Sequence, residues 1–284
     1  MSNTNPPPPA TKSLADLVMP PVIYRLPGMD RVQVYSNLDY SGVDPTRLLM
    51  DVYVPTGSTS SEPRPMMILV HGGAGPDLSP KDWGFFQSWG RLIAAAGMVA
   101  VTFNHRHSPP PDSLLAESNS DVRNAIDYVR ANAASWHADP DRIGVCVWSI
   151  GGPLIAALLR ERPTYVRCLV TFCAMLDLQQ YASFVDATML EFLKEFSPIK
   201  SLRPGTGKLS PMLILRAGRD NVPFLNDALD RFVATALAEN APITVVNHPS
   251  GEHGFENQND DERSREIIRG ALEFMKAHLA MRQF

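Results

Sequence analysis

The chain has 284 residues, of which 44% are hydrophobic and 20% are charged, and these fractions are typical of a globular protein with a sizeable core. Its formal net charge of -4 provides no basic surface for nucleic acid or an anionic membrane, and no apolar run is long enough to cross a bilayer. We therefore expect a small-molecule partner, with no nucleic acid and no membrane bound. The length is compatible with one large α/β domain.

The N-terminal segment differs from the rest of the chain. Residues 1–21 contain the four-proline run Pro6 to Pro9 and few apolar residues, so they are predicted to form a flexible or extended arm. The alternative is that the arm packs on a partner subunit, which makes a homodimer one expectation. The segment lacks the basic and apolar regions of a signal peptide, so a cytoplasmic location is expected. Residues 22–284 are predicted to form a single domain.

Three cysteines, Cys146, Cys168 and Cys173, lie in apolar runs. An odd number in such runs fits reduced thiols of a protein core better than a disulfide framework. Cys168 and Cys173 lie on opposite faces if their segment is one strand, so they are not expected to pair.

Apolar runs and amphipathic segments alternate along most of the chain. The β-rich segments 32–38 and 47–54 are predicted to form an antiparallel sheet edge. Six near-continuous apolar runs are predicted as buried parallel strands: 65–71, 98–104, 142–148, 167–173, 211–216 and 243–248. Helical periodicity is found at 83–96, 120–135, 150–160, 223–238 and 261–281. This order predicts an α/β fold with a mostly parallel central sheet of about eight strands and helices on both faces.

One connection, residues 174–210, is too long for a plain crossover. It contains a helical stretch near 189–194 and a Pro- and Gly-rich exit, so it is expected to cover the sheet's C-terminal edge as a small cap. Its apolar residues either line an acyl pocket or bury the face of the cap helix itself. These residues are Met175, Leu176, Phe184, Met189 and Phe192.

Ser149 directly follows the buried run 142–148 and precedes Gly151 by two residues. A serine on a sharp turn from strand to helix exposes its hydroxyl above the sheet, and small neighbours make room for that turn. The helix that follows would point its N-terminal amides at the same place. In the G-x-S-x-G pattern the residue two before the serine is small, whereas here it is Val147. The alternative is a serine that only caps the following helix.

A glycine-rich loop after the run 65–71 supports the catalytic interpretation. Such a loop can bring backbone N–H groups close to a substrate oxygen. The N–H groups of Gly73 and Ile150 are the candidates for an oxyanion hole, with Gly72 beside them. The alternative is a simple turn.

An acid and a base are expected after the later strands. Asp220 stands in a Gly-containing turn, where it would either orient an imidazole or only form the turn, and Asp177 is the rival acid. His253 lies in a Gly-flanked loop and is preferred as the base over His248, which is still at the end of the last strand. Serine, aspartate and histidine in this order at successive strand ends are unlikely to occur by chance.

These segments together resemble the α/β-hydrolase superfamily, and within it the esterase, dienelactone-hydrolase and prolyl-oligopeptidase-like branch. The resemblance runs from about residue 47 to the C-terminus and is carried by LLMDVYVP, ILVHGGAG, VAVTFNHRHSP, DVRNAIDYVRANAASWHADPDRIGV and GEHGF. It implies the α/β-hydrolase fold, a Ser149–Asp220–His253 triad, and structural roles for Asp121, Asp139 and Asp141. The departures from the family pattern are Val147 and Ala74, the latter in place of a third glycine.

The predicted function is that of a serine esterase acting on small or medium-sized carboxylic esters, with Trp148, Ala74 and Met175 as substrate-binding candidates. A peptidase or amidase acting on short peptides is the second hypothesis. A non-catalytic ligand-binding member of the fold is the third. The sequence shows no metal-ligand cluster, phosphate loop or dinucleotide fingerprint, so no cofactor and no metal are expected.

Overall fold

A computed structural model describes residues 16, 18–42, 47–57, 62–73, 78–107, 114–202 and 208–280. Their centre is an eight-stranded sheet with strand order β1-β2-β4-β3-β5-β6-β7-β8. The strands are β1 (Gln33–Asp39), β2 (Leu49–Val54), β3 (Arg64–Val70), β4 (Val99–Phe103), β5 (Ala138–Trp148), β6 (Val166–Phe172), β7 (Met212–Ala217) and β8 (Ile243–His248). The β1–β2 and β2–β4 pairs are antiparallel and all the other pairs are parallel, which confirms the predicted fold class.

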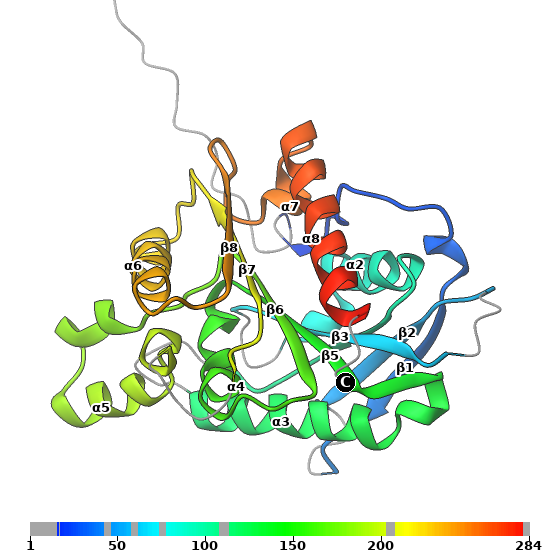
Figure 1. Ribbon diagram of the computed structural model, residues 1–284, viewed down its shortest axis with the longest axis horizontal. Helices are drawn as coiled ribbons and strands as arrows, with labels where there is room; N and C mark the ends of the chain where they lie inside the picture. Colours follow the sequence, from blue (N-terminus) through cyan, green and yellow to red (C-terminus); the bar gives the residue numbers. More distant parts are fainter. Residues whose placement is uncertain are drawn as a thin grey trace, which may run out of the picture.

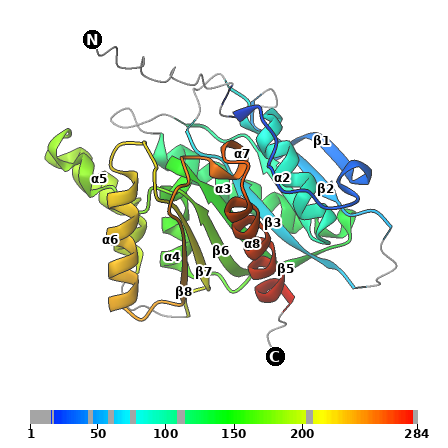
Figure 2. The ribbon, with the colours of Figure 1, turned by 90° about the horizontal axis from the view of Figure 1, so that it is seen from above.

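Helices cover both faces of the sheet (Figures 1 and 2). Helices α2 (Gly84–Ala95) and α8 (Glu262–Ala280) lie on one face. Helices α3 (Leu115–Ala131), α4 (Ala156–Glu161) and α6 (Leu225–Ala238) lie on the other, so that β8 runs between α6 and α8 in Figure 1. Parallel strands need such crossover helices, and β3 to β7 are therefore buried almost throughout. No described helix is long and apolar enough to cross a membrane.

The helix predicted over 150–160 is not a continuous α-helix. Ser149–Ile155 forms the 3₁₀ helix η4, and only Ala156–Glu161 is α-helical. Pro153 explains this difference, because it has no N–H to donate to the carbonyl four residues earlier, which belongs to Ser149. That carbonyl instead accepts a hydrogen bond of 2.8 Å from the backbone N–H of Met175, at the end of the neighbouring strand.

The connection at 174–210 contains η5 (Gln179–Ser183), α5 (Ala187–Glu195) and η6 (Pro198–Ser201). Its base is fixed by Asp177, whose carboxylate is 2.7 Å from Nε of Arg231 on α6 and also accepts from Ser197. Figure 1 shows α5 at the outer side of α4 and α6, far along the molecule from α2. The remaining elements are η1 (Met29–Arg31), η2 (Pro80–Asp82), η3 (Ala133–Trp136) and α7 (Phe255–Gln258).

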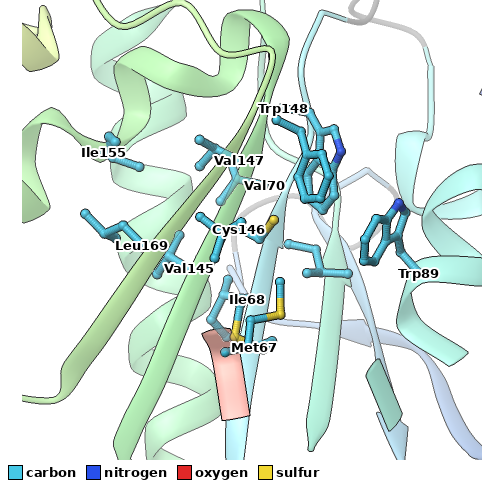
Figure 3. Packing of buried hydrophobic residues seen from close by; sticks show 14 of the residues in the cluster. Met67, Ile68, Val70, Trp89, Val145, Cys146, Val147, Trp148, Ile155 and Leu169 are labelled. Carbon is cyan, nitrogen blue, oxygen red and sulfur yellow. The ribbon is translucent and has the colours of Figure 1, made fainter. Parts of the chain in front are cut away.

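Side chains of β5 alternate between the two faces, as Figure 3 shows for Val147 and Trp148. Val147 is completely buried on the side of Ile155, and its backbone pairs with Val70 and Thr171. Trp148 faces the opposite way toward Trp89 of α2. The sheet therefore accommodates a valine before the nucleophile turn.

The three cysteines are free and buried, as the sequence predicts.

The described end of the N-terminal segment lies on the domain. The Pro20 carbonyl accepts a hydrogen bond from Asn257 Nδ2 on α7, and the N–H of Val22 donates to Ser88 Oγ on α2. The Met19 carbonyl lies against Gly84, where a β-carbon would clash with it. The last part of the predicted arm is thus held between α2 and α7. The domain limits at residues 21 and 22 stay a prediction.

Candidate active site

Ser149 stands at the C-terminal end of β5 in a left-handed backbone conformation, with φ of 53°. Such a conformation is unfavourable for residues other than glycine and is found at functional turns when the surroundings impose it. Here Gly151 allows the turn, because a β-carbon at that position would run into the carbonyl of His71. The structure shows no cap of η4 by a side-chain hydrogen bond, and the N-cap residue is Trp148 rather than Ser149.

The loop after β3 runs against this turn. A β-carbon at Gly72 would lie 2.7 Å from Cβ of Ser149, and one at Gly73 would lie 3.1 Å from Cδ1 of Ile150. The structure therefore brings together the residues predicted to form an oxyanion hole. The expected contribution of a long helix dipole is reduced, because η4 is a seven-residue 3₁₀ helix. Ala74 lies outside the described residues.

Two stacked histidines lie next to the glycine loop. The rings of His71 and His105 are 3.6 Å apart and nearly parallel, and Nδ1 of His71 is 2.8 Å from the carbonyl oxygen of Gly72. Nε2 of His71 accepts from the N–H of His105, which fixes the tautomer with the proton on Nδ1. Burial lowers the pKa values of both histidines, so they are neutral scaffold groups.

His253 and Asp220 meet after β8 and β7. Nδ1 of His253 is 2.8 Å from Oδ2 of Asp220, whose other oxygen accepts a bond from the N–H of Val222. The Asp220 side chain is fully buried and that of His253 is 25% exposed. A buried carboxylate at Nδ1 holds the proton there and leaves Nε2 as the basic nitrogen.

The rival acid and base lie elsewhere. Asp177 is paired with Arg231 in the connection after β6. His248 is buried, with Nε2 2.9 Å from Ser264 Oγ. Nε2 of His248 is also 3.3 Å from Oδ1 of Asp261, and neither His248 nor Asp177 lines the cavity that contains Ser149 and His253.

The aspartates predicted to be structural form ion pairs away from this site. Asp121 accepts from the side chain of Arg106 at 2.7 and 2.9 Å, Asp139 pairs with Arg142, and Asp141 pairs with Arg130.

One cavity of about 170 Å³ joins Ser149 and His253. Its wall is largely aromatic, and it also contains a buried carboxyl group and a residue of the N-terminal segment. The other lining residues are Val18, Gly72, Gly73, Trp83, Phe85, Phe86, Trp148, Phe172, Cys173, Gly254, Glu256 and Asn257. Trp148 lines this cavity beside Ser149, and its role as a substrate contact stays a prediction.

Met175 does not line this cavity, and neither do the other apolar residues of the cap. The Met175 side chain is buried and its sulfur is 2.7 Å from Gln180 Nε2, while its backbone supports Ser149. The cap residues considered for an acyl pocket are therefore absent from this wall, whereas Phe85 and Phe86 at the start of α2 line it. The double aromatic Phe85-Phe86 was the available sequence signal, but its periodicity alone indicates only a helix face turned to the core.

Cys173, Asp220 and His253 are a group whose ligand atoms all lie within 4.8 Å of one another among the described residues. Metal binding by all three residues would require the Cys173 thiolate and a free carboxylate oxygen of Asp220. Burial raises the pKa of the Cys173 thiol, and the two oxygens of Asp220 are already bonded to Nδ1 of His253 and to the N–H of Val222. The chemistry of this set favours a hydrogen-bonded imidazole over a metal site.

The sheet order and crossover helices are those of an α/β-hydrolase. A solved structure of a thermophilic esterase from the Planctomycetes species Thermogutta terrifontis, with propionate bound, is similar with a TM-score of 0.70 and 24% identity, covering 90% of this chain and 98% of that one. The model of the prolyl oligopeptidase family matches residues 115–282, more than half of the chain. The protein belongs to this family. A second family model, BD-FAE, matches residues 50–165.

Curated relatives share shorter or more divergent segments. The non-reducing polyketide synthase atr1 of Stereocaulon alpinum is 30% identical over 125 residues, which are 42% of this chain and 5% of that protein. The esterase LipC of Mycobacterium tuberculosis is 26% identical over 251 residues, which are 76% of this chain and 58% of that protein. The chain thus spans only a small part of the polyketide synthase and little more than half of the esterase.

Proposed function

We propose that the protein is a serine hydrolase that cleaves carboxylic esters of small or medium-sized substrates through an acyl-enzyme on Ser149. The observation that carries the proposal is the cavity that joins the strained Ser149 turn to His253, whose Nδ1 is held by Asp220. A nucleophile, a base and an orienting acid in this relation are the elements of covalent acyl transfer. The esterase names of LipC and of the Thermogutta protein support the same reaction.

In the acylation step, Oγ of Ser149 forms a bond to the ester carbonyl carbon while Nε2 of His253 takes the hydroxyl proton. The carbonyl oxygen becomes an oxyanion, which the N–H groups of Gly73 and Ile150 stabilise. The bond to the alcohol oxygen then breaks, and His253 returns its proton to the leaving alcohol. Water then attacks the acyl carbon while His253 takes its proton, the bond to Oγ of Ser149 breaks, and His253 returns the proton to Oγ as the acid leaves. Asp220 stays ionised and stabilises the imidazolium.

The cavity supports a small acyl group or ring. Its volume of about 170 Å³ is close to that of an apolar cavity of ~150 Å³, which holds one benzene molecule. Aromatic walls favour apolar groups over charged ones. The similar Thermogutta esterase structures hold propionate or butyrate, which are short acids of this size class.

A short-peptide peptidase or amidase is the second candidate, because the matching family model is that of prolyl oligopeptidases. Both reactions use the same nucleophile and differ in the leaving group that His253 must protonate. A matched pair of an ester and an amide with the same acyl group separates them. Faster release from the ester supports the proposal, whereas equal or faster release from the amide favours the peptidase.

Labelling with a fluorophosphonate probe tests the nucleophile. Wild-type protein is expected to be labelled once per chain and Ser149→Ala not at all, with the modified peptide containing residue 149. An unlabelled wild-type protein would contradict the proposed function and favour a non-catalytic member of the fold. A cytoplasmic, cofactor-free enzyme remains our prediction for this activity, and the three free buried thiols support a reducing compartment.

A further inference from the structure

A second carboxyl group lies in the cavity behind the triad. Glu256, the second residue of the short helix α7, follows His253 by three positions and is 1% exposed. Its Oε1 accepts a hydrogen bond of 2.7 Å from the indole Nε1 of Trp148. Its Oε2 is buried and has no hydrogen-bond partner among the described residues. Burial of an acidic side chain in an aromatic cavity costs folding free energy, so a function is expected for Glu256.

The hydrogen bond connects the two segments that carry the nucleophile and the base. Trp148 immediately precedes Ser149, and its ring stacks on Phe172 at 5.4 Å. Phe85 and Phe86 make edge-to-face contacts with the same ring, with centroid distances of 5.8 and 5.4 Å. The indole can therefore hardly turn, and its N–H gives Glu256 a fixed partner. The carboxyl group thus links the end of β5 to the loop of His253.

Glu256 is also surrounded by groups that sense its charge. Burial raises its pKa to about 7, while the charge of His253 acts in the opposite direction. Asp220 raises it further, and the charge of Glu256 in turn adds to the raised pKa values of the buried thiols of Cys146 and Cys173. Glu256 therefore changes its charge in the pH range in which an imidazole base works.

We propose that Glu256 is a positioning residue that fixes Trp148 next to the nucleophile and whose ionised carboxylate supports the protonated form of His253 during acyl transfer. This inference rests on the proposed function, because it assigns His253 the role of base. It adds to the triad a carboxylate that does not touch the substrate. The catalytic rate then depends on the charge of Glu256.

The substitution Glu256→Gln tests this inference, because the amide oxygen can still accept from Trp148 while the charge is removed. The measured quantity is the rate of fluorophosphonate labelling between pH 5 and pH 9. Removal of the negative neighbour is expected to move the acid limb of the profile to lower pH, because the imidazolium loses an opposite charge. The plateau rate is expected to fall, because the imidazolium formed in the reaction loses its support.

Glu252→Gln is the matched control, because it removes the same charge from the exposed part of the same loop. Its labelling profile is expected to overlay that of the wild type, since exposed charges are screened by solvent. Trp148→Phe removes the indole N–H but keeps the carboxyl group. It is expected to lower the plateau rate without the downward move of the acid limb.

Overlay of the Glu256→Gln and wild-type profiles would overturn the inference while leaving the proposed function intact. An unlabelled wild-type protein would instead contradict the proposed function itself. A second measurement does not depend on folding of the Gln variant. In this measurement the tryptophan fluorescence of Ser149→Ala is followed as the pH changes, and Ser149→Ala/Trp148→Phe serves as the blank. An inflection within about one unit of pH 7 is expected, because the carboxyl group bonded to the indole gains or loses its charge there. A flat titration would also overturn the inference.

Discussion

Gly72 lies so close to Ser149 that a β-carbon added at Gly72 would be 2.7 Å from Cβ of Ser149 and 2.8 Å from the Trp148 carbonyl oxygen. Both neighbours belong to the nucleophile turn, so neither can move away without displacing Ser149. We predict that Gly72→Ala lowers kcat/KM for a short-chain chromogenic ester by about 10²-fold, the loss expected when a reacting group is misplaced by ~1 Å. Steady-state kinetics measure this effect.

Gly270→Ala is the matched control, since a β-carbon at this position on α8 meets no atom within 4 Å. Alanine is the better helix former by roughly 0.5–1 kcal/mol, so the variant is expected to be slightly more stable and equally active. If Gly72→Ala were as active as Gly270→Ala, the tight approach of the glycine loop would have no bearing on the reaction.

Asp220 and Asp177 are both buried carboxylates after parallel strands, but only Asp220 contacts His253. Asp220→Asn is expected to lower kcat by about 10³–10⁴-fold, because the amide no longer fixes the reactive tautomer of the imidazole. Asp177→Asn is expected to keep nearly the wild-type kcat. It should instead lose roughly 1–3 kcal/mol of unfolding free energy, because Arg231 and Ser197 lose a charged acceptor.

Steady-state kinetics and urea unfolding measure kcat and the free energy of unfolding of the two variants. A large loss of kcat in Asp177→Asn at unchanged stability would reverse the assignment of the acid.

The sequence allows the sheet to be predicted better than the cavity, for physical reasons. Buried parallel strands are continuous apolar runs, so all eight strands are predicted within a few residues, including β8 at Ile243–His248. The cavity wall comes from distant segments, among them Val18, Phe85 and Glu256, and no local pattern predicts that they meet. Met175 was expected there but supports the backbone of Ser149 instead.

A single residue explains the main error within an element. Pro153 lies inside an apolar, helix-like pattern, and periodicity alone does not show that its missing N–H interrupts the α-helical hydrogen bonds there. Glu256 could have been noticed as a charged residue between Phe255 and the polar end of α7, but its burial depends on Trp148, 108 positions earlier. Such contacts become visible only once the fold is known.

The N-terminal segment gives a further prediction. Val18 lines the cavity, and the Pro20 carbonyl and the Ile23 N–H bind α7 at Asn257 and Glu256. Deletion of residues 1–19 is expected to open this side of the cavity and so remove surface that binds the substrate. KM for short-chain esters should therefore rise more than kcat falls, because lost substrate binding weakens the ground-state and transition-state complexes alike. The measurement is a chain-length series of chromogenic esters.

Deletion of residues 1–15 is the control for this truncation, because it leaves Asp16 and all the contacts described above in place. It is expected to behave as the wild type in the same ester series. Equal kinetics of both truncations and the wild type would show that Val18 does not shape the substrate site. Light scattering of the same proteins tests the predicted homodimer, and a shift to monomer with the shorter deletion would assign the arm to a subunit interface.

The buried histidines beside the glycine loop predict how stability depends on pH. Burial lowers the pKa of His107 from 6.5 to about 4, and it also lowers the pKa values of His71 and His105. Between pH 6.5 and about 4 the unfolded chain therefore binds a proton at His107 that the folded chain does not bind, and the lowered pKa values of His71 and His105 act in the same direction. The free energy of unfolding is therefore highest above pH 6.5. It decreases as the pH falls through this window, by at most about 1.4 kcal/mol per pH unit for each proton.

Urea unfolding at pH 7, 6 and 5 measures the slope of this decrease. His107→Gln removes one of these protons, so its stability should fall less steeply than that of the wild type, whereas equal slopes would mean that His107 is already accessible to protons in the folded protein.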